Sequence, residues 1–250
     1  MTDLKDLNAR LLSAVRAQDA RAVRALLARG ADPGAADENA VTALAAASFY
    51  GDAGIVTALI EKGADVNAKG RQGLTPLMQA VAAARYEATL VLLSRGARVE
   101  DASEAGRTAL MMVGTVAAAL PGNGRADHQR IDLLCVKIAR ALIEKGAKVN
   151  AASRQGESPL LNAAGFGLPR TVHALLSHGA RVNHQNRSGD SPLIAAAREP
   201  FRQGDYAAAI ATLLKHGAKK ALRNRQGESA LDAARAKKTG DRRIIDLLSP

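Results

Sequence analysis

The chain has 250 residues, with 35 Lys and Arg against 24 Asp and Glu and a formal net charge of +11. Its one cysteine, Cys135, excludes an internal disulfide, and its longest apolar stretch, residues 109–120, is shorter than the roughly 20 residues of a membrane span. The first residues form no apolar core, so no signal peptide is expected. We therefore expect a cytoplasmic protein, or a periplasmic or secreted one if a signal peptide has been removed. The Ala- and Arg-rich composition favours a bacterial source.

A leucine recurs every 33 residues through much of the chain, and a Gly-Ala pair follows each of the first six. The leucines are Leu11, Leu44, Leu77, Leu110, Leu160, Leu193 and Leu231. Such a period is the signature of a repeat protein, whose units stack to bury a shared core. It predicts an all-α repeat solenoid in one domain, residues 1–250. The seven units, including two polar caps, span 4–36, 37–69, 70–102, 103–152 with an insertion at 117–133, 153–185, 186–223 and 224–250.

Each unit after the first opens with a Ser or Thr that can cap a helix. In Thr75-Pro76 the hydroxyl can accept from an unpaired backbone N–H, and Pro at the first helical position gives up an N–H that has no partner there. Ser158-Pro159 and Ser191-Pro192 repeat this arrangement. The other caps, each followed by Ala, are Thr42, Thr108 and Ser229.

Two helices are predicted in each unit. The first is short and Ala-rich, and the second carries paired apolar positions at helical spacing, as in residues 55–60. The second helix stops at the glycine of the Gly-Ala pair, for example Gly63. A polar stretch such as residues 65–73 then leads to the next cap, and it predicts a tight β-turn or hairpin.

These motifs resemble the ankyrin repeat family over almost the whole chain. Thr75-Pro76-Leu77 matches the family's opening and Gly63 to Asn67 its Gly-Ala-Asp-Val-Asn ending, with variants at 146–150 and 179–183. The family's usual His after the Leu is missing in every unit, which affects a local hydrogen bond rather than the fold. The resemblance implies helix–turn–helix units joined by β-turns or hairpins. It also implies a concave surface, lined by the turns and first helices, on which partners bind.

The fourth unit departs from the regular length. Residues 108–120 can extend its first helix and residues 126–145 its second, with a loop at 121–124, so the insertion should protrude at the edge opposite the turns. Residues 199–205 lengthen another unit at the same kind of place. Two long loops on one edge indicate either a second contact surface or ordinary loop tolerance.

No catalytic constellation is visible. There is no phosphate-binding loop, no nucleophile elbow and no cysteine pair, and none of the five histidines forms a helical metal-binding motif. Cys135 lies in an apolar run, which predicts a buried thiol. We expect no enzyme activity, no cofactor and no metal.

Three aromatic residues are candidate anchors for a partner. They follow the repeat leucine by five or six positions, at the end of the first helix, where other units carry small residues. They are Phe49, Tyr50 and Phe166. Aromatic side chains on a binding face are typical interface anchors. The alternative is that they pack across neighbouring repeats or under a turn.

Four arginines stand two residues before the turn glycine of their units: Arg71, Arg154, Arg187 and Arg225. Repeats that pack about 8–10 Å apart would place the last three in a ladder, although exposed arginines also serve solubility. Residues 215–250 add ten Lys and Arg against four Asp and Glu. We therefore expect a monomeric, non-catalytic module that binds an acidic protein partner. The alternative is nucleic-acid or anionic-surface binding by the basic C-terminal repeats, although residues 215–250 contain no aromatic residue for base stacking.

Overall fold

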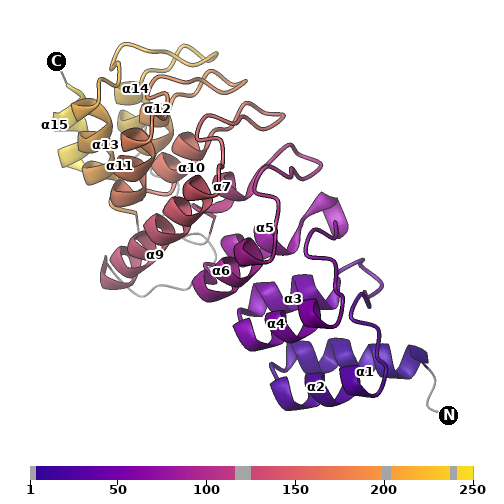
Figure 1. Ribbon diagram of the computed structural model, residues 1–250. Coiled ribbons are helices and arrows are strands. Elements are labelled where there is room, and N and C mark those ends of the chain that lie inside the picture. Colours follow the sequence, from indigo (N-terminus) through magenta and orange to yellow (C-terminus); the bar gives the residue numbers. More distant parts are fainter. Residues whose placement is uncertain (1–3, 116–124, 199–203, 237–240, 250) are drawn as a thin grey trace. The chain divides into compact units, whose positions relative to one another are not determined.

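The computed structural model describes residues 4–115, 125–198, 204–236 and 241–249 (Figure 1). The chain forms two compact units, Met1–Glu104 and Ala105–Pro250, called unit 1 and unit 2 below. Both are built of paired helices. Across the described residues there is no β-sheet, only isolated antiparallel bridges at Ala36–Thr42 and Arg223–Ser229. The repeat pattern predicts one domain over residues 1–250, and the boundary between the two units falls in the turn of the fourth predicted repeat.

Unit 1 contains three helix pairs. The first helices are α1 (Leu4–Arg16), α3 (Ala43–Tyr50) and α5 (Pro76–Ala82), and the second helices are α2 (Ala20–Ala28), α4 (Ala53–Glu61) and α6 (Tyr86–Ser94). A short 3-10 helix, η1 (Arg71–Gly73), lies in the turn before α5. First helices pack on first helices and second on second, in addition to the contact within each pair.

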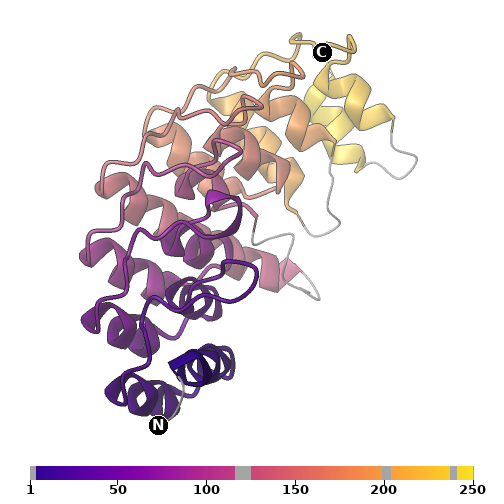
Figure 2. The ribbon, with the colours of Figure 1, turned by 90° about the vertical axis from the view of Figure 1, so that its right-hand side faces the viewer.

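Unit 2 contains four pairs with the same arrangement. Its first helices are α7 (Ala109–Met112), α10 (Pro159–Gly165), α12 (Pro192–Ala197) and α14 (Ala230–Arg235). Its second helices are α9 (Arg125–Glu144), α11 (Pro169–Ser177), α13 (Tyr206–Lys215) and α15 (Arg242–Leu248). Figure 2 shows the turn segments of this unit running side by side along one margin of the helices.

The repeat leucines form the core of both units. Leu11, Leu44, Leu77, Leu110, Leu160 and Leu193 are almost completely buried. Leu231 of the last described repeat is only half-buried. Burial of such a side chain stabilises the fold by about 1.5–3 kcal/mol. The stacking of one repeat on the next therefore supplies most of the stability.

The predicted Ser and Thr caps begin most of the first helices. The hydroxyl of Thr42 accepts from the Ala45 N–H at 3.1 Å, and Ser158 accepts from Leu161 at 3.2 Å. The same bond is made by Thr75, Ser191 and Ser229. Thr108 was predicted to do the same but does not. The Met111 N–H donates to its carbonyl instead, and its buried hydroxyl has no partner among the described residues.

The fourth repeat differs from the prediction in its first helix. Helix α7 ends at Met112, and residues 113–115 form a turn where a helix to 120 was expected. Gly114 stands at this turn, and glycine disfavours continuation of a helix. Residues 116–120 and the predicted loop at 121–124 lie outside the described residues, as do residues 199–203 of the second long loop. The second helix, α9, closely follows the predicted range 126–145.

The described part of the insertion packs into unit 2 rather than protruding. His128, Ile131 and Asp132 on α9 are buried. The Asp132 carboxylate accepts from the backbone N–H groups of Arg170 and Thr171, at 2.8 and 3.0 Å, and from the Thr171 hydroxyl at 2.7 Å. These donors belong to the first turn of α11, whose own N-cap residue makes no side-chain cap. The longer helix therefore caps its neighbour, a role that the repeat pattern did not indicate.

Cys135 is buried as predicted. Its thiol donates to the Val113 carbonyl at 2.9 Å. Burial, followed by the nearby negative charge of Asp132, raises the pKa of this thiol far above its ordinary range. Because the thiolate is the reactive form, Cys135 is a packing residue and not a nucleophile.

Candidate protein interaction surface

The turns of unit 2 are tied to one another by backbone hydrogen bonds. The N–H groups of Arg154, Arg187 and Arg225 each donate at 2.9 Å to a carbonyl in the preceding turn. The acceptors are Ala105, Gln155 and Ser188. Each acceptor directly precedes the turn glycine of its repeat. Three of the four predicted arginines therefore occupy one register along three consecutive turns.

The turn glycines make this close stacking possible. Gly189 has φ +79°, and a Cβ built on it would lie 2.8 Å from the backbone nitrogen of Arg225. Gly106 has φ +74° and a similar conflict with the Arg154 nitrogen, at 2.9 Å. A side chain at either position would be strained by its φ and would displace the next turn. The register of the arginines thus depends on the turn glycine of the preceding repeat.

The three guanidinium groups are available for binding. Arg154, Arg187 and Arg225 are exposed, and none of them forms an ion pair with a described residue. An exposed arginine can bind a carboxylate through two parallel hydrogen bonds. We call these three residues the arginine row.

A second cationic series, missed at the sequence level, lies six residues earlier in each turn: Lys148, Arg181 and Lys219. Asparagines of the preceding repeat fix two of these positions. The Asn150 side chain accepts from the Arg181 N–H at 2.9 Å and donates to the Gly179 carbonyl at 2.9 Å. Asn183 does the same for Lys219 and Gly217. The signal was present in the Gly-Ala-Lys-Val-Asn and Gly-Ala-Arg-Val-Asn variants.

Unit 1 makes the same two kinds of hydrogen bond at its third turn and carries different charges. The Glu104 N–H donates to Gln72 at 2.9 Å, and the Arg98 N–H donates to Asn67 at 2.8 Å. Its residues at the arginine-row position are Glu38, Arg71 and Glu104, and at the second position Asp32, Asp65 and Arg98. Residues 1–104 hold 12 Lys and Arg against 13 Asp and Glu, whereas residues 105–250 hold 23 against 11. The excess of positive charge belongs entirely to unit 2.

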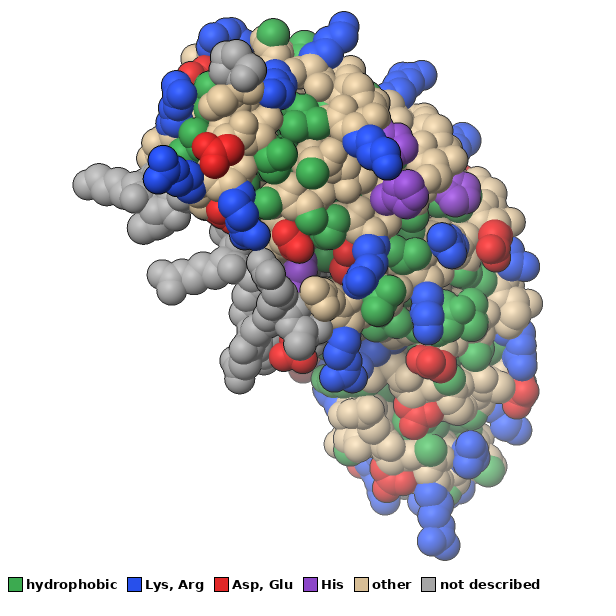
Figure 3. Space-filling view, turned by 90° about the vertical axis from the view of Figure 1, so that its left-hand side faces the viewer, with side chains coloured by type: hydrophobic (Ala, Val, Ile, Leu, Met, Phe, Trp, Pro, Cys, Tyr) green, Lys and Arg blue, Asp and Glu red, His purple; other side chains and the backbone are tan. Residues whose placement is uncertain are grey.

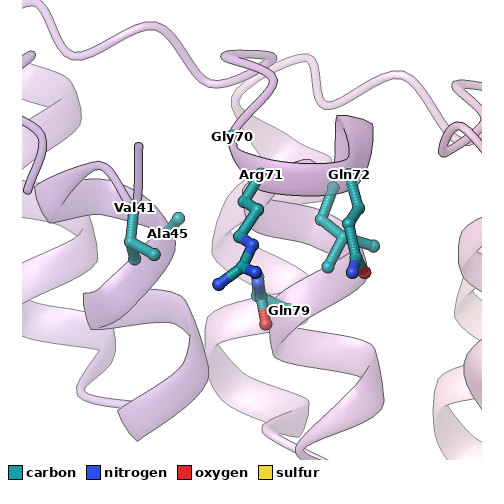
Figure 4. Close-up of a pocket in the computed structure, with 7 residues that line it drawn as sticks. Val41, Ala45, Gly70, Arg71, Gln72 and Gln79 are labelled. Atoms are coloured by element: carbon teal, nitrogen blue, oxygen red, sulfur yellow. The ribbon is translucent and has the colours of Figure 1, made fainter. Parts of the chain in front are cut away.

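Arg71 borders a hollow in unit 1. A pocket of about 370 Å³ is lined by the turn at 70–74, by Val41 and Ala45 at the start of α3, and by Gln79 of α5 (Figure 4). In Figure 4 the Arg71 and Gln79 side chains project into the same space between the two first helices. This wall of turn and first helices is the surface that the resemblance assigns to partners. Arg71 is thus exposed beside a groove, in a different unit from the arginine row.

Phe49 and Tyr50 lie together at the end of α3. Their ring centroids are 5.6 Å apart, with the planes at 85°. Phe49 is 47% exposed and Tyr50 is half-buried. The Arg85 side chain donates to the Phe49 carbonyl at 2.9 Å, and it passes so close to Gly51 that a Cβ there would lie 2.4 Å from its Cδ. Phe49 is therefore presented to solvent at the end of a fixed backbone.

Phe166 has a different environment. It caps the C-terminal end of α10 and is half-buried, and a Cβ on Gly114 of the preceding repeat would lie 2.5 Å from its ring. The ring fills the space left by that glycine. This contact favours packing between repeats over the role of a solvent-facing anchor.

The basic C-terminal end is partly neutralised. Arg223 pairs with Asp232 at 2.9 Å, and Arg198 bridges Asp190 at 2.7 Å and Glu228 at 3.0 Å. The Ser229 backbone N–H and hydroxyl also donate to the Asp232 carboxylate, and with Arg223 they hold its pKa below the usual value. Figure 3 nevertheless shows Lys and Arg side chains over the surface of this end of the chain. The bridged arginines contribute to repeat packing, and the arginine row remains unpaired among the described residues.

Within the described ranges, no helix is long and apolar enough to cross a membrane. The same residues contain no cluster of three or more His, Cys, Asp or Glu that could hold a metal ion.

The comparisons agree with this architecture. A family model described as ankyrin repeats (3 copies) matches residues 11–103 and 134–224. The crystal structure of the human ASB11 ankyrin repeat domain is 26% identical, with a TM-score of 0.77, and the match covers 96% of this chain and 98% of that one. The ankyrin repeat domain of Bcl-3 is 27% identical, with a TM-score of 0.68 and coverage of 96% and 97%. No curated protein matches by sequence. With the family model covering most of its length and stacked helix pairs in both units, this chain belongs to the ankyrin repeat family.

Proposed function

We propose that this chain is a non-catalytic interaction module whose turn-side, concave surface in unit 2 holds an extended, acidic segment of a protein partner. Ankyrin repeats are generally protein–protein interaction modules, which sets the class of function. The observation that carries the proposal is the arginine row: three exposed guanidinium groups in one register, fixed by backbone bonds and unpaired among the described residues.

The spacing of the row indicates the form of the segment. Packed helices lie about 8–10 Å apart, and one arginine is contributed by each repeat. An extended chain rises about 3.3 Å per residue, so three residues cover roughly the same distance. A segment with a carboxylate at every third position would therefore meet Arg154, Arg187 and Arg225 in turn.

The aromatic pair of unit 1 is proposed as a second contact. Phe49 is exposed, carries Tyr50 edge-on against it, and occupies a position where the next two repeats have Ala82 and Thr115. Such a ring can anchor an apolar side chain of a partner. The pair and the arginine row lie in different units, so each is tested by itself.

A peptide titration tests the arginine row. The probe is a fluorescent peptide with Glu at every third position, and its control has the same composition with the Glu residues clustered. Exposed ion pairs contribute about 0.2–1 kcal/mol each, and charge reversal turns attraction into repulsion. The triple variant Arg154→Glu, Arg187→Glu, Arg225→Glu should bind the spaced peptide about 100-fold more weakly by fluorescence anisotropy.

A matched variant separates the row from general charge. Arg140→Glu, Lys145→Glu, Lys215→Glu changes the net charge by the same amount at exposed positions on or next to the second helices α9 and α13. We expect it to weaken binding less than about fivefold. Equal losses in the two triple variants, or equal affinity for spaced and clustered peptides, would contradict the proposal.

Nucleic-acid binding is the second candidate, favoured by the charge of unit 2. A single-stranded oligonucleotide of the same charge as the peptide is titrated in parallel. If it binds more tightly than the peptide, and if log affinity falls linearly and steeply with log salt concentration, this alternative replaces the protein partner.

A further inference from the structure

Two histidines of unit 2 stand apart from the other three. One ring nitrogen in each of the other three contacts a backbone carbonyl: His128 with Gly167 at 2.8 Å, His178 with Ala174 at 2.7 Å, and His184 with Gly156 at 2.7 Å. The rings of His173 and His216 are exposed and contact each other, and no described residue forms a hydrogen bond with their ring nitrogens. Figure 3 shows histidine side chains gathered on this face.

The geometry of the pair suits a shared metal ion. The ring centroids are 5.6 Å apart and the planes are inclined at 63°. A metal–nitrogen bond is about 2.0–2.1 Å and the ring nitrogen lies about 1.1 Å from its centroid, so two imidazoles on one tetrahedral ion have centroids about 5 Å apart. The observed centroid separation of 5.6 Å is close to that value.

The backbone holds both ligands in place. His173 lies within α11 and His216 directly follows α13, and these two helices pack against each other. The His216 N–H donates to the carbonyls of Thr212 and Leu213, which keeps it in the helical ladder. Ligands on two rigid helices lose little conformational freedom when an ion binds, which favours binding.

We propose that His173 and His216 form a surface site for a divalent transition-metal ion, Zn²⁺ or Cu²⁺, which joins repeats 153–185 and 186–223. Imidazole nitrogen selects these ions over Mg²⁺ and Ca²⁺, which prefer oxygen ligands. With no third His, Cys, Asp or Glu grouped there among the described residues, water or a bound molecule completes the coordination. The inference is independent of the proposed partner, because the site lies on the second helices and not on the turns.

Titration of the tag-free full chain with ZnCl₂ by isothermal calorimetry tests this site. We expect one ion per chain, and at least tenfold weaker binding in His173→Asn and in His216→Asn. Both side chains are exposed, so the variants should keep the wild-type unfolding midpoint in urea. Cu²⁺ should bind more tightly than Zn²⁺, with two nitrogen ligands visible by electron paramagnetic resonance.

A control variant excludes diffuse binding to other histidines. His184→Gln keeps a donor for the Gly156 carbonyl and lies outside the pair, so its affinity should stay within about twofold of wild type. The proposal is wrong if the double variant His173→Asn, His216→Asn binds Zn²⁺ as tightly as wild type, or if wild type binds none. It is also wrong if loss of only one of the two histidines weakens binding, since a chelate needs both.

Discussion

Units 1 and 2 share one kind of backbone bond between neighbouring turns, yet the charges at those turns are mixed in unit 1 and all positive in unit 2. Glu104 and Arg154 each donate a backbone N–H to the preceding turn at 2.9 Å, although their side chains have opposite charge. The stacking uses a backbone N–H and, in most turns, a glycine, and it leaves the neighbouring side chains unconstrained. Because stacking does not fix the residue type at these positions, their charged side chains can contact a partner.

The second helices are capped in more than one way, and local caps occur in both units, as at α13 of unit 2 through Asp205 on the Ala208 N–H. In unit 1 the helices α2 and α4 are capped locally, by Asp19 on the Ala22 N–H and by Asp52 on the Ile55 N–H, both at 2.9 Å. In unit 2, α11 receives its cap from Asp132 of the preceding repeat. A cap supplied across an interface couples the two repeats, whereas a local cap stabilises one helix.

The largest expected effect comes from removing the cap that Asp132 supplies to α11. Asp132 is 2% exposed and accepts three hydrogen bonds, so Asp132→Ala leaves buried donors unpaired and should cost about 3 kcal/mol. Asp52→Ala removes one partly buried cap and should cost about 1 kcal/mol. Urea unfolding of both variants measures the two costs. An equal loss of stability in the two variants would show that the cap supplied by Asp132 from the neighbouring repeat adds nothing beyond an ordinary N-cap.

An intermediate effect is expected from the two phenylalanines. Phe166→Ala empties the space beside Gly114 and should lower the free energy of unfolding by about 2 kcal/mol, less than the 3–5 kcal/mol of a fully buried ring. Phe49→Ala should change it by less than about 0.5 kcal/mol, as for other exposed positions. The urea midpoints distinguish them. If Phe49→Ala proves the more destabilising, the exposed ring belongs to the packing of unit 1 and is no anchor.

The smallest expected effect is a response to acid in the last repeat of unit 2. The pKa of Asp232 is held below its usual value by the Ser229 backbone N–H and hydroxyl, and then by Arg223. The ordinary Asp pKa is about 3.9, so this stabilisation is present above about pH 4 and is lost as the pH falls through the lower pKa of the folded state.

Carboxyl NMR follows the titration of Asp232 directly. Its midpoint should lie below the ordinary Asp value, and Ser229→Ala should raise it by removing the hydroxyl donor. The amide signals of α14 should shift together with the carboxyl signal. A wild-type midpoint at or above the ordinary value would contradict the depressed pKa.

Most of the fold follows from short-range signals in the sequence. The leucine period, the Thr42 and Ser158 caps and the glycine ends depend on residues within one repeat, and the structure shows these features where the sequence predicts them. The cap predicted at Thr108 failed because α7 is only one turn long and its Met111 N–H bonds to a backbone carbonyl instead.

The candidate site was only partly predictable. The register of Arg154, Arg187 and Arg225 could be read from their constant distance to the turn glycine, since equivalent positions in stacked repeats lie side by side. The sequence did not predict that these arginines lie in a different unit from Phe49 and Arg71, because the repeat pattern continues through the boundary between the units. The packing of Phe166 on Gly114 was equally hidden, since a pattern within one repeat does not show what the neighbouring repeat leaves open.

The sequence by itself determined the repeat, its helices and turns, and the positions of the charges, because a period of 33 residues encodes local hydrogen bonds and one buried face. Only the tertiary structure decided that Asp132 caps α11, that His173 meets His216, and that His128 of α9 contacts the Gly167 carbonyl. Each of these joins residues more than 35 positions apart. Their proximity is set by how one repeat packs on the next, and no local propensity encodes it.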